Sequence, residues 1–118
     1  TLSRDEDKKE RLAAKGATLI ELEADESGHI SLPALMRDLA DRGINEVHTE
    51  CGQRLAGALL SQQLVDQVVL YLAPHLLGSQ ARGGFDLGEL TDMEQRKSCS
   101  IRDIRQVGDD LRLTLNVN

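Results

Sequence analysis

The sequence is poor in aromatic residues, since Tyr71 and Phe85 are the only ones and there is no Trp. Single-stranded nucleic acids bind to proteins largely by stacking on aromatic side chains, so this scarcity argues against such a ligand. Basic residues are also in the minority, with 14 Lys and Arg against 20 Asp and Glu and a formal net charge of −6. Phosphate neutralisation needs a basic excess, and a nucleic-acid partner is therefore not expected.

Long apolar stretches are absent as well. No segment approaches the roughly 20 residues that a membrane helix needs, and no membrane partner is expected. The first residues are charged and do not read as a signal peptide. Cys51 and Cys99 lie far apart without a CxxC pair, so no metal site is expected. Two thiols without a secretory signal favour a cytoplasmic location.

The sequence does have an aliphatic core and the length of one domain, 1–118. Leucine is the dominant apolar residue, which suits helices packed on a sheet better than an all-β sandwich. Apolar spacing and capping residues predict helices and strands that alternate along the chain. The expected helices are 5–15, 32–42 and one that begins after Gly52; the expected strands are 17–22, 44–50, 67–72, 101–107 and 111–117.

This order predicts an α/β fold. The first three strands should lie parallel, joined by helical crossovers. The segment 67–72 is apolar on both faces, as is typical of a central buried strand. The last two strands, which are separated by Gly108 to Asp110, should form an antiparallel hairpin.

The segment 47–60 holds the most informative pattern: a strand, a tight turn at Gly52 and a helix. A helix start offers free N–H groups and a positive dipole end, which together bind phosphate. Gly57 and Ala58 keep this helix thin, so that a ligand or a strand can approach. Glu50 would lie at the crevice mouth and accept hydrogen bonds from a substrate. An ordinary strand-to-helix turn, with Glu50 capping a neighbouring N–H, explains the same pattern.

The residues 50–60 (ECGQRLAGALL), followed by 64–78 and 81–83, closely resemble the reductase domain of the bifunctional riboflavin-biosynthesis deaminase/reductase. The resemblance implies a dihydrofolate-reductase-like α/β fold, with a mostly parallel sheet, flanking helices and a C-terminal antiparallel hairpin. It further implies that 1–118 is the C-terminal portion of that reductase domain. The family's deaminase zinc signature, HxE followed by PCxxC, does not occur in the sequence.

The resemblance also implies the chemistry. The family uses NADPH to reduce 5-amino-6-(5-phosphoribosylamino)uracil to its ribitylamino form, and family members associate into homo-oligomers. Glu50 matches the glutamate that contacts substrate. The residues that match the NADP-binding loop and helix start are Gly52, Gln53, Arg54, Leu55, Ala56, Gly57 and Ala58.

Two alternatives remain open from the sequence. One is a dimerising α/β module without catalysis, and the other is a related NADP-dependent reductase with a different pyrimidine or pterin substrate. No residue in the sequence identifies itself as a general acid. The family's reductase domain is longer than this chain, so the chain by itself is expected to fold, to self-associate through an exposed strand edge, and to be inactive.

Overall fold

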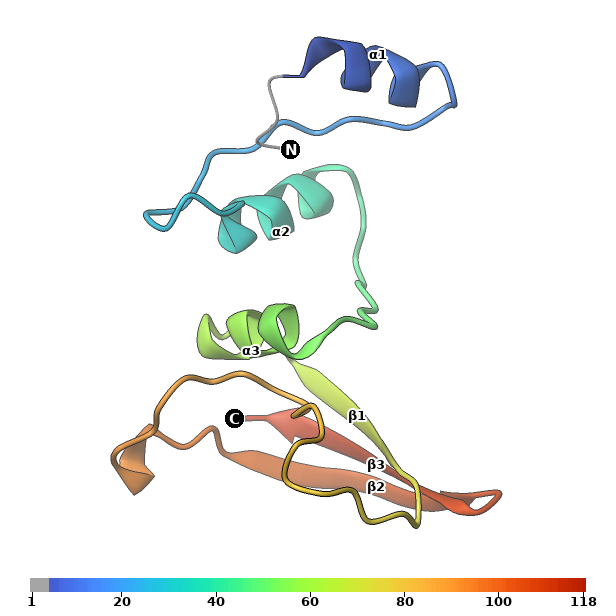
Figure 1. Cartoon of the computed structure of the whole chain (residues 1–118), viewed down its shortest axis with the longest axis vertical. Coiled ribbons are helices and arrows are strands. Elements are labelled where there is room, and N and C mark those ends of the chain that lie inside the picture. Colours follow the sequence, from blue (N-terminus) through green and yellow to red (C-terminus); the bar gives the residue numbers. More distant parts are fainter. Residues whose placement is uncertain (1–4) are drawn as a thin grey trace. The chain divides into compact units, whose positions relative to one another are not determined.

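The computed structural model describes residues 5–118 (Figure 1). Residues 1–4 of the expected domain lie outside the described part. The chain divides into two compact units, Thr1–His48 and Thr49–Asn118. Each unit is described separately below, and the second one carries the residues of the predicted site.

The first unit contains the helices α1 (Glu6–Ala13) and α2 (Leu32–Asp41). The Asp5 carboxylate caps α1 by accepting a hydrogen bond of 3.0 Å from the Lys8 backbone N–H. Ser31 caps α2 by accepting from the Ala34 N–H at 3.3 Å, and Pro33 lies in the first turn of that helix. Both predicted helices are confirmed, with slightly shorter bounds.

The second unit contains one helix, a short 3-10 turn and three strands. Their bounds are α3 (Gln53–Ser61), β1 (Gln67–Leu72), η1 (Met93–Gln95), β2 (Cys99–Val107) and β3 (Asp110–Val117). The strands form one sheet in the order β1-β3-β2, and both neighbouring pairs are antiparallel. The predicted hairpin is confirmed: β2 and β3 are joined at Gly108, whose φ of +62° favours glycine.

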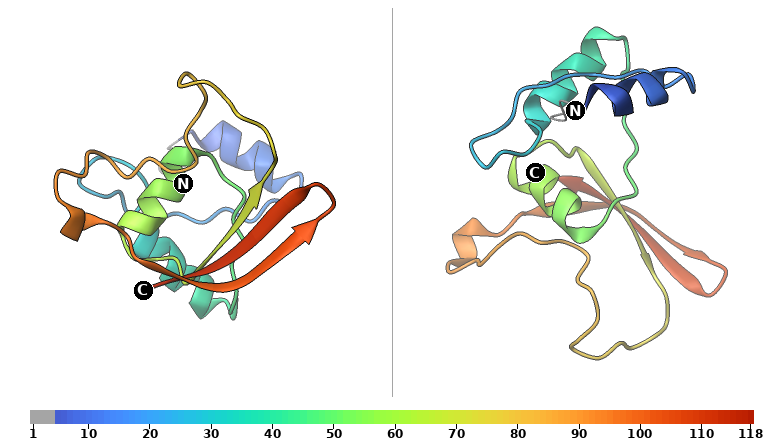
Figure 2. Two further views of the ribbon diagram at one scale, coloured as in Figure 1. Left: turned by 90° about the horizontal axis from the view of Figure 1, so that it is seen from below. Right: turned by 45° about the horizontal axis from the view of Figure 1, so that its top comes forward.

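The sheet has an apolar and a polar face. Leu70 of β1 is paired with Leu113 of β3 on the apolar face, and Val69 is paired with Thr114 on the polar one. Along β1, Leu70 is half-buried and Val69 is exposed, which indicates that the apolar face is the covered one. The helix α3 lies to one side of this sheet (Figure 2), and its Leu59 and Leu60, each 6% exposed, are the buried apolar residues of the described chain.

Three expectations about strands are not met within residues 5–118. The segments 17–22 and 44–50 form no strand in the described chain, and only an isolated bridge pairs Ala24 with Ile30. The expected parallel pairing is not seen within residues 5–118, where the sheet is antiparallel. The strand 67–72 is an edge strand and not a central one. The common reason is that a strand needs hydrogen bonds from a neighbour, and apolar patterning alone does not supply one.

Candidate functional site

The turn before α3 leaves the helix start open. Gly52 is the N-cap residue, and having no side chain it makes no side-chain hydrogen bond to this helix. The first helical hydrogen bond runs from the Ala56 N–H to the Gly52 carbonyl at 3.1 Å. The N–H groups of Gln53, Arg54 and Leu55 therefore precede the hydrogen-bonded ladder. Such a helix start can receive an anion through its N–H donors and its dipole.

Gly52 is not required by the backbone of this turn. Its φ of −73° and ψ of 165° are accessible to any residue. A Cβ atom at Gly52 would meet nothing within 4 Å. The tight turn expected at Gly52 therefore does not depend on glycine. What the missing side chain provides is clear space in front of the helix start, where a ligand can approach closely.

Gly57 lies in a different environment, because it is buried and the backbone of a loop passes against it. A Cβ atom at Gly57 would lie 2.8 Å from the backbone nitrogen of Asp86 and closer still to its carbonyl group. The same Asp86 donates its N–H to the carbonyl of Gln53 at 3.0 Å. The close approach that the small residues allow is made at Gly57 by an irregular loop, in place of the ligand or strand that the sequence suggested.

The loop residue Gly83 also approaches the first turn of α3. A Cβ atom there would lie 3.3 Å from the Gln53 side-chain oxygen Oε1. Gln53 thus has the loop on one side through both its carbonyl and its side chain. The sequence did not single out Asp86, because no periodicity or motif marks an irregular segment that packs on a helix.

The predicted site residues fall into two groups by burial. Glu50 and the stretch 52–55 are exposed at the open start of the helix. Ala56 and Ala58 are half-buried, and Gly57 is buried under the loop. Only the first group can be reached by a ligand in this arrangement. The half-buried and buried residues, Ala56 to Ala58, pack the helix whose exposed start carries the first group.

Other kinds of site find little support in residues 5–118. No group of three or more His, Cys, Asp or Glu residues among them is arranged to hold a metal ion. Cys51 and Cys99 are exposed free thiols. No helix in the described residues is long and apolar enough to cross a membrane.

Comparison with known protein families identifies the family of the chain. The family model described as the RibD C-terminal domain matches residues 1–113. The chain belongs to this family. This confirms the resemblance to the riboflavin-biosynthesis reductase domain that the residues around Gly52 indicated.

Curated relatives carry names that agree with the family. The chain is similar to the riboflavin biosynthesis protein RibD of Escherichia coli, at 43% identity over 88 residues that make up 75% of this chain and 24% of the relative. It is also similar to the 5-amino-6-(5-phosphoribosylamino)uracil reductase of Buchnera aphidicola, at 32% identity over 95 residues, 80% of this chain and 46% of the relative. The chain thus spans about a quarter and just under half of these two proteins.

A solved structure gives the same result for the fold. RibD of Acinetobacter baumannii is matched with a TM-score of 0.81 and 29% identity over 92% of this chain and 29% of that one. The three helices and the small antiparallel sheet are therefore those of a RibD-like α/β protein.

Proposed function

We propose that the protein carrying this chain is a reductase of riboflavin biosynthesis that uses NADPH to reduce 5-amino-6-(5-phosphoribosylamino)uracil. The observation that carries this proposal is the family match, together with a relative of the family that is named for this reaction. The chain covers less than half of that relative, so the activity is proposed for the whole protein.

The start of α3 fits a phosphate group of the cofactor. Three backbone N–H groups, from Gln53 to Leu55, precede the helical ladder, and the N-cap residue Gly52 has no side chain to occupy them. Gly52 adds no Cβ atom in front of them, and the exposed Arg54 adds a positive charge to the first turn. This combination of donors, space and charge favours an anionic group such as a phosphate of NADP. Bound NADPH supplies the hydride, whereas these residues bind and orient it.

Glu50 is the proposed substrate contact. It is exposed and lies two residues before the N-cap of α3, so a cofactor bound at the helix start would lie next to it. Its carboxylate accepts hydrogen bonds, and the hydroxyl and amino groups of the substrate donate them. The role proposed for Glu50 is orientation of the substrate beside the nicotinamide, and no proton transfer is assigned to it.

The finer description of the fold is also a proposal. In a dihydrofolate-reductase-like sheet, the segments 17–22 and 44–50 would become strands once neighbouring strands were hydrogen-bonded to them. Their apolar patterning and the RibD kinship support this arrangement. The free edge of β1 would accept a further strand in the same way. The chain by itself is therefore proposed to be folded, inactive and prone to form homo-oligomers.

The substitution Glu50→Gln in the whole protein tests this function. Loss of a charge-assisted hydrogen bond costs about 1.5–3 kcal/mol, so kcat/KM for the phosphoribosylaminouracil should fall by roughly tenfold or more. The affinity for NADPH, measured by fluorescence titration, should stay within about twofold of wild type, because one rim charge that does not touch the cofactor has little effect on its binding.

Glu46→Gln is the matched control, since Glu46 is another exposed acid of the same stretch of chain and should leave kcat/KM unchanged. A wild-type rate for Glu50→Gln would remove the substrate contact from the proposal and favour a capping role. Absence of NADPH oxidation by the wild-type protein with this substrate would overturn the proposed function itself. In that case, turnover of another pyrimidine or a pterin would identify the related reductase.

A further inference from the structure

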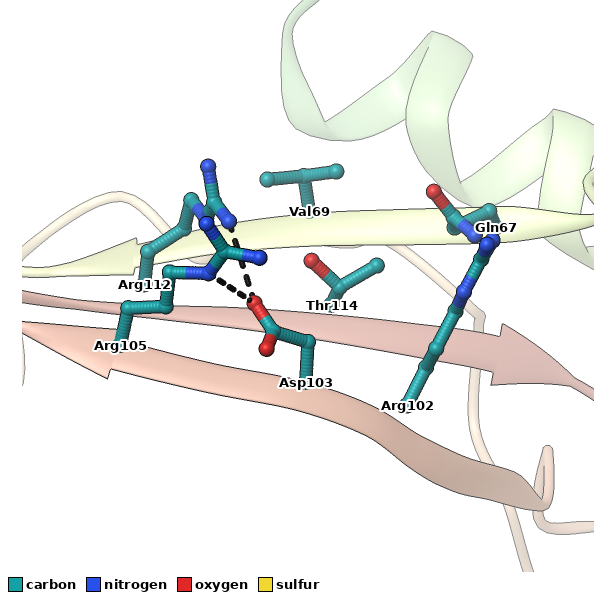
Figure 3. A pocket seen from close by; sticks show the side chains of 7 residues that line it. All are labelled: Gln67, Val69, Arg102, Asp103, Arg105, Arg112 and Thr114. Carbon is teal, nitrogen blue, oxygen red and sulfur yellow. Dashed lines mark hydrogen bonds and ion pairs between the residues drawn. The ribbon is translucent and has the colours of Figure 1, made fainter.

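The polar face of the three-stranded sheet holds a second cluster of charged side chains, separate from the turn before α3 (Figure 3). The cluster surrounds a hollow of about 360 Å³. Its polar side chains come from all three strands: Gln67 of β1, Arg102, Asp103 and Arg105 of β2, and Arg112 and Thr114 of β3. Nothing in the proposed reductase chemistry uses these residues.

The register of the hairpin explains why arginines gather here. Arg105 and Arg112 are directly opposite each other on β2 and β3. A register shift between Ile101 and Asp103 leaves Arg102 as an extra residue without a cross-strand partner. A bulge of this kind redirects a side chain, and Arg102 extends across the sheet toward Gln67 (Figure 3). Two arginines therefore lie at one end of the hollow and a third lies at the other.

The charges of the cluster are not balanced. Asp103 accepts hydrogen bonds through one oxygen, Oδ2, from Arg105 Nε at 2.7 Å and from Arg112 Nη2 at 3.1 Å. These two contacts, that from Arg105 first, hold the pKa of Asp103 below its ordinary value, so the carboxylate stays ionised. Two guanidinium groups thus share one carboxylate and that of Arg102 is not paired with it, which leaves an excess of two positive charges around the hollow of a chain whose net charge is −6.

One donor in the cluster lacks an acceptor. Arg112 Nε is buried and has no hydrogen-bond partner within the described chain. A buried donor without a partner is costly, and the usual explanation is a missing water or ion. The Thr114 hydroxyl lies between the two arginine ends of the hollow (Figure 3). The arginine N–H groups at both ends of the hollow and the Thr114 hydroxyl in its middle are therefore available as donors to one small group with several acceptor oxygens.

We propose that this polar sheet face binds a phosphate-class oxyanion between Arg102, Arg105 and Arg112. Guanidinium groups match tetrahedral oxyanions because each presents a planar fork of N–H donors to two oxygens. The anion offsets the excess positive charge of the three guanidinium groups. The phosphate comes either from inorganic phosphate or from a phosphorylated sugar. The proposal does not depend on the reductase function, because it concerns a different face of the molecule.

Titration of the purified protein with inorganic phosphate tests the site. The Nε–H signals of arginine side chains are followed by ¹H–¹⁵N NMR and assigned with single Arg→Gln variants. The signals of Arg102, Arg105 and Arg112 should shift saturably, whereas that of Arg37, an exposed arginine on α2, should not. Sodium chloride at matched ionic strength should leave all four signals in place.

Two variants give opposite expectations. Arg102→Gln should weaken phosphate binding about tenfold, and because Arg102 makes no ion pair within residues 5–118, the sheet should stay intact. Asp103→Asn should tighten binding severalfold, because it removes the carboxylate that competes with the anion. The control Arg37→Gln should have no effect on the affinity.

Ribose 5-phosphate serves as the second probe and separates the two sources. Equal affinity for both probes would identify the phosphate group alone as the ligand, whereas tighter binding of ribose 5-phosphate would identify a sugar phosphate. Equal shifts with chloride would overturn the proposal. Unchanged phosphate affinity in Arg102→Gln would overturn it too, as would weaker binding in a folded Asp103→Asn variant.

Discussion

Two glycines of the same helical segment do opposite things. Gly52 is exposed before α3, with open space where a side chain would project. Gly57 is buried one and a half turns further on, with the Asp86 backbone pressed against its Cα. The first keeps a surface accessible, and the second lets a loop fix the helix. Residues that match one family motif therefore need not share one function, and here the motif divides into an exposed part, where a ligand is proposed, and a packing part.

The largest effect is expected at Gly57. In Gly57→Ala the new methyl group would overlap the Asp86 backbone, which cannot move aside as a flexible side chain would. Overpacking of this kind costs about 1–3 kcal/mol, more than the roughly 1 kcal/mol that alanine gains in helix propensity. Urea unfolding should show a lower free energy of unfolding than wild type. Wild-type stability would mean that the loop leaves the helix at no cost, and the contrast between the two glycines would fail.

Gly52→Ala is the matched control for this measurement. Its backbone angles suit alanine, and its Cβ atom meets nothing within 4 Å. Alanine is a poorer N-cap than glycine by roughly 1 kcal/mol, but it also lowers the entropy of the unfolded chain by about 0.4–1 kcal/mol, so the net change in stability should be small. The two variants differ only in which glycine acquires a methyl group. The difference between their free energies of unfolding therefore measures the cost of the contact between Gly57 and the loop.

A smaller effect, on affinity alone, is expected when Gly52 becomes larger. Gly52→Val fills the space in front of the helix start and should weaken NADPH binding about tenfold, the equivalent of one lost hydrogen bond to a phosphate. Gly52→Ser sharpens the test, because its hydroxyl can cap the helix, raise stability by a few tenths of a kcal/mol, and compete with the phosphate for the same N–H groups. Fluorescence titration measures both affinities. If both variants bind NADPH as wild type does, the helix start is not the phosphate site.

Structural features that depend on residues close together in the sequence could be predicted from it, and features that depend on distant residues could not. The start of the helix predicted over 32–42 and the turn at Gly108 depend on neighbouring residues, and both predictions are confirmed. The segments 17–22 and 44–50 have the patterning of strands, but a strand is completed by a neighbouring strand, and neither segment belongs to the sheet of residues 5–118. Apolar patterning could not show this.

The candidate site was predictable to the same extent. The family motif is enough to propose Glu50 and the start of α3 as site residues, because these residues adjoin in sequence. The packing of Asp86 on Gly57 brings together two segments that are distant in sequence and carry no periodic signal. The arginine cluster depends on the register and the bulge of the hairpin, which decide whether Arg102 shares a face with Arg105. The position of a β-bulge cannot be read from the pattern of residue types, so the sequence did not predict the arginine cluster.

The smallest effect is expected at Gly83, and it tests why Gly57 is sensitive. A Cβ atom at Gly83 would lie 3.3 Å from Gln53 Oε1, a tight contact, but with the end of a flexible side chain. A small rotation of the Gln53 side chain relieves it. Replacing glycine by alanine also lowers the entropy of the unfolded chain, which stabilises a protein by about 0.4–1 kcal/mol where the backbone conformation is compatible. The cost of the tight contact and the gain from the lower entropy of the unfolded chain nearly cancel, so the free energy of unfolding of Gly83→Ala in urea should lie within about 0.5 kcal/mol of wild type.

A loss of stability as large as that of Gly57→Ala would contradict this explanation. It would show that any methyl group between the loop and α3 is destabilising, whether it meets backbone or side chain. The sensitivity of Gly57 to substitution would then come from packing against the loop in general and not from its contact with the Asp86 backbone.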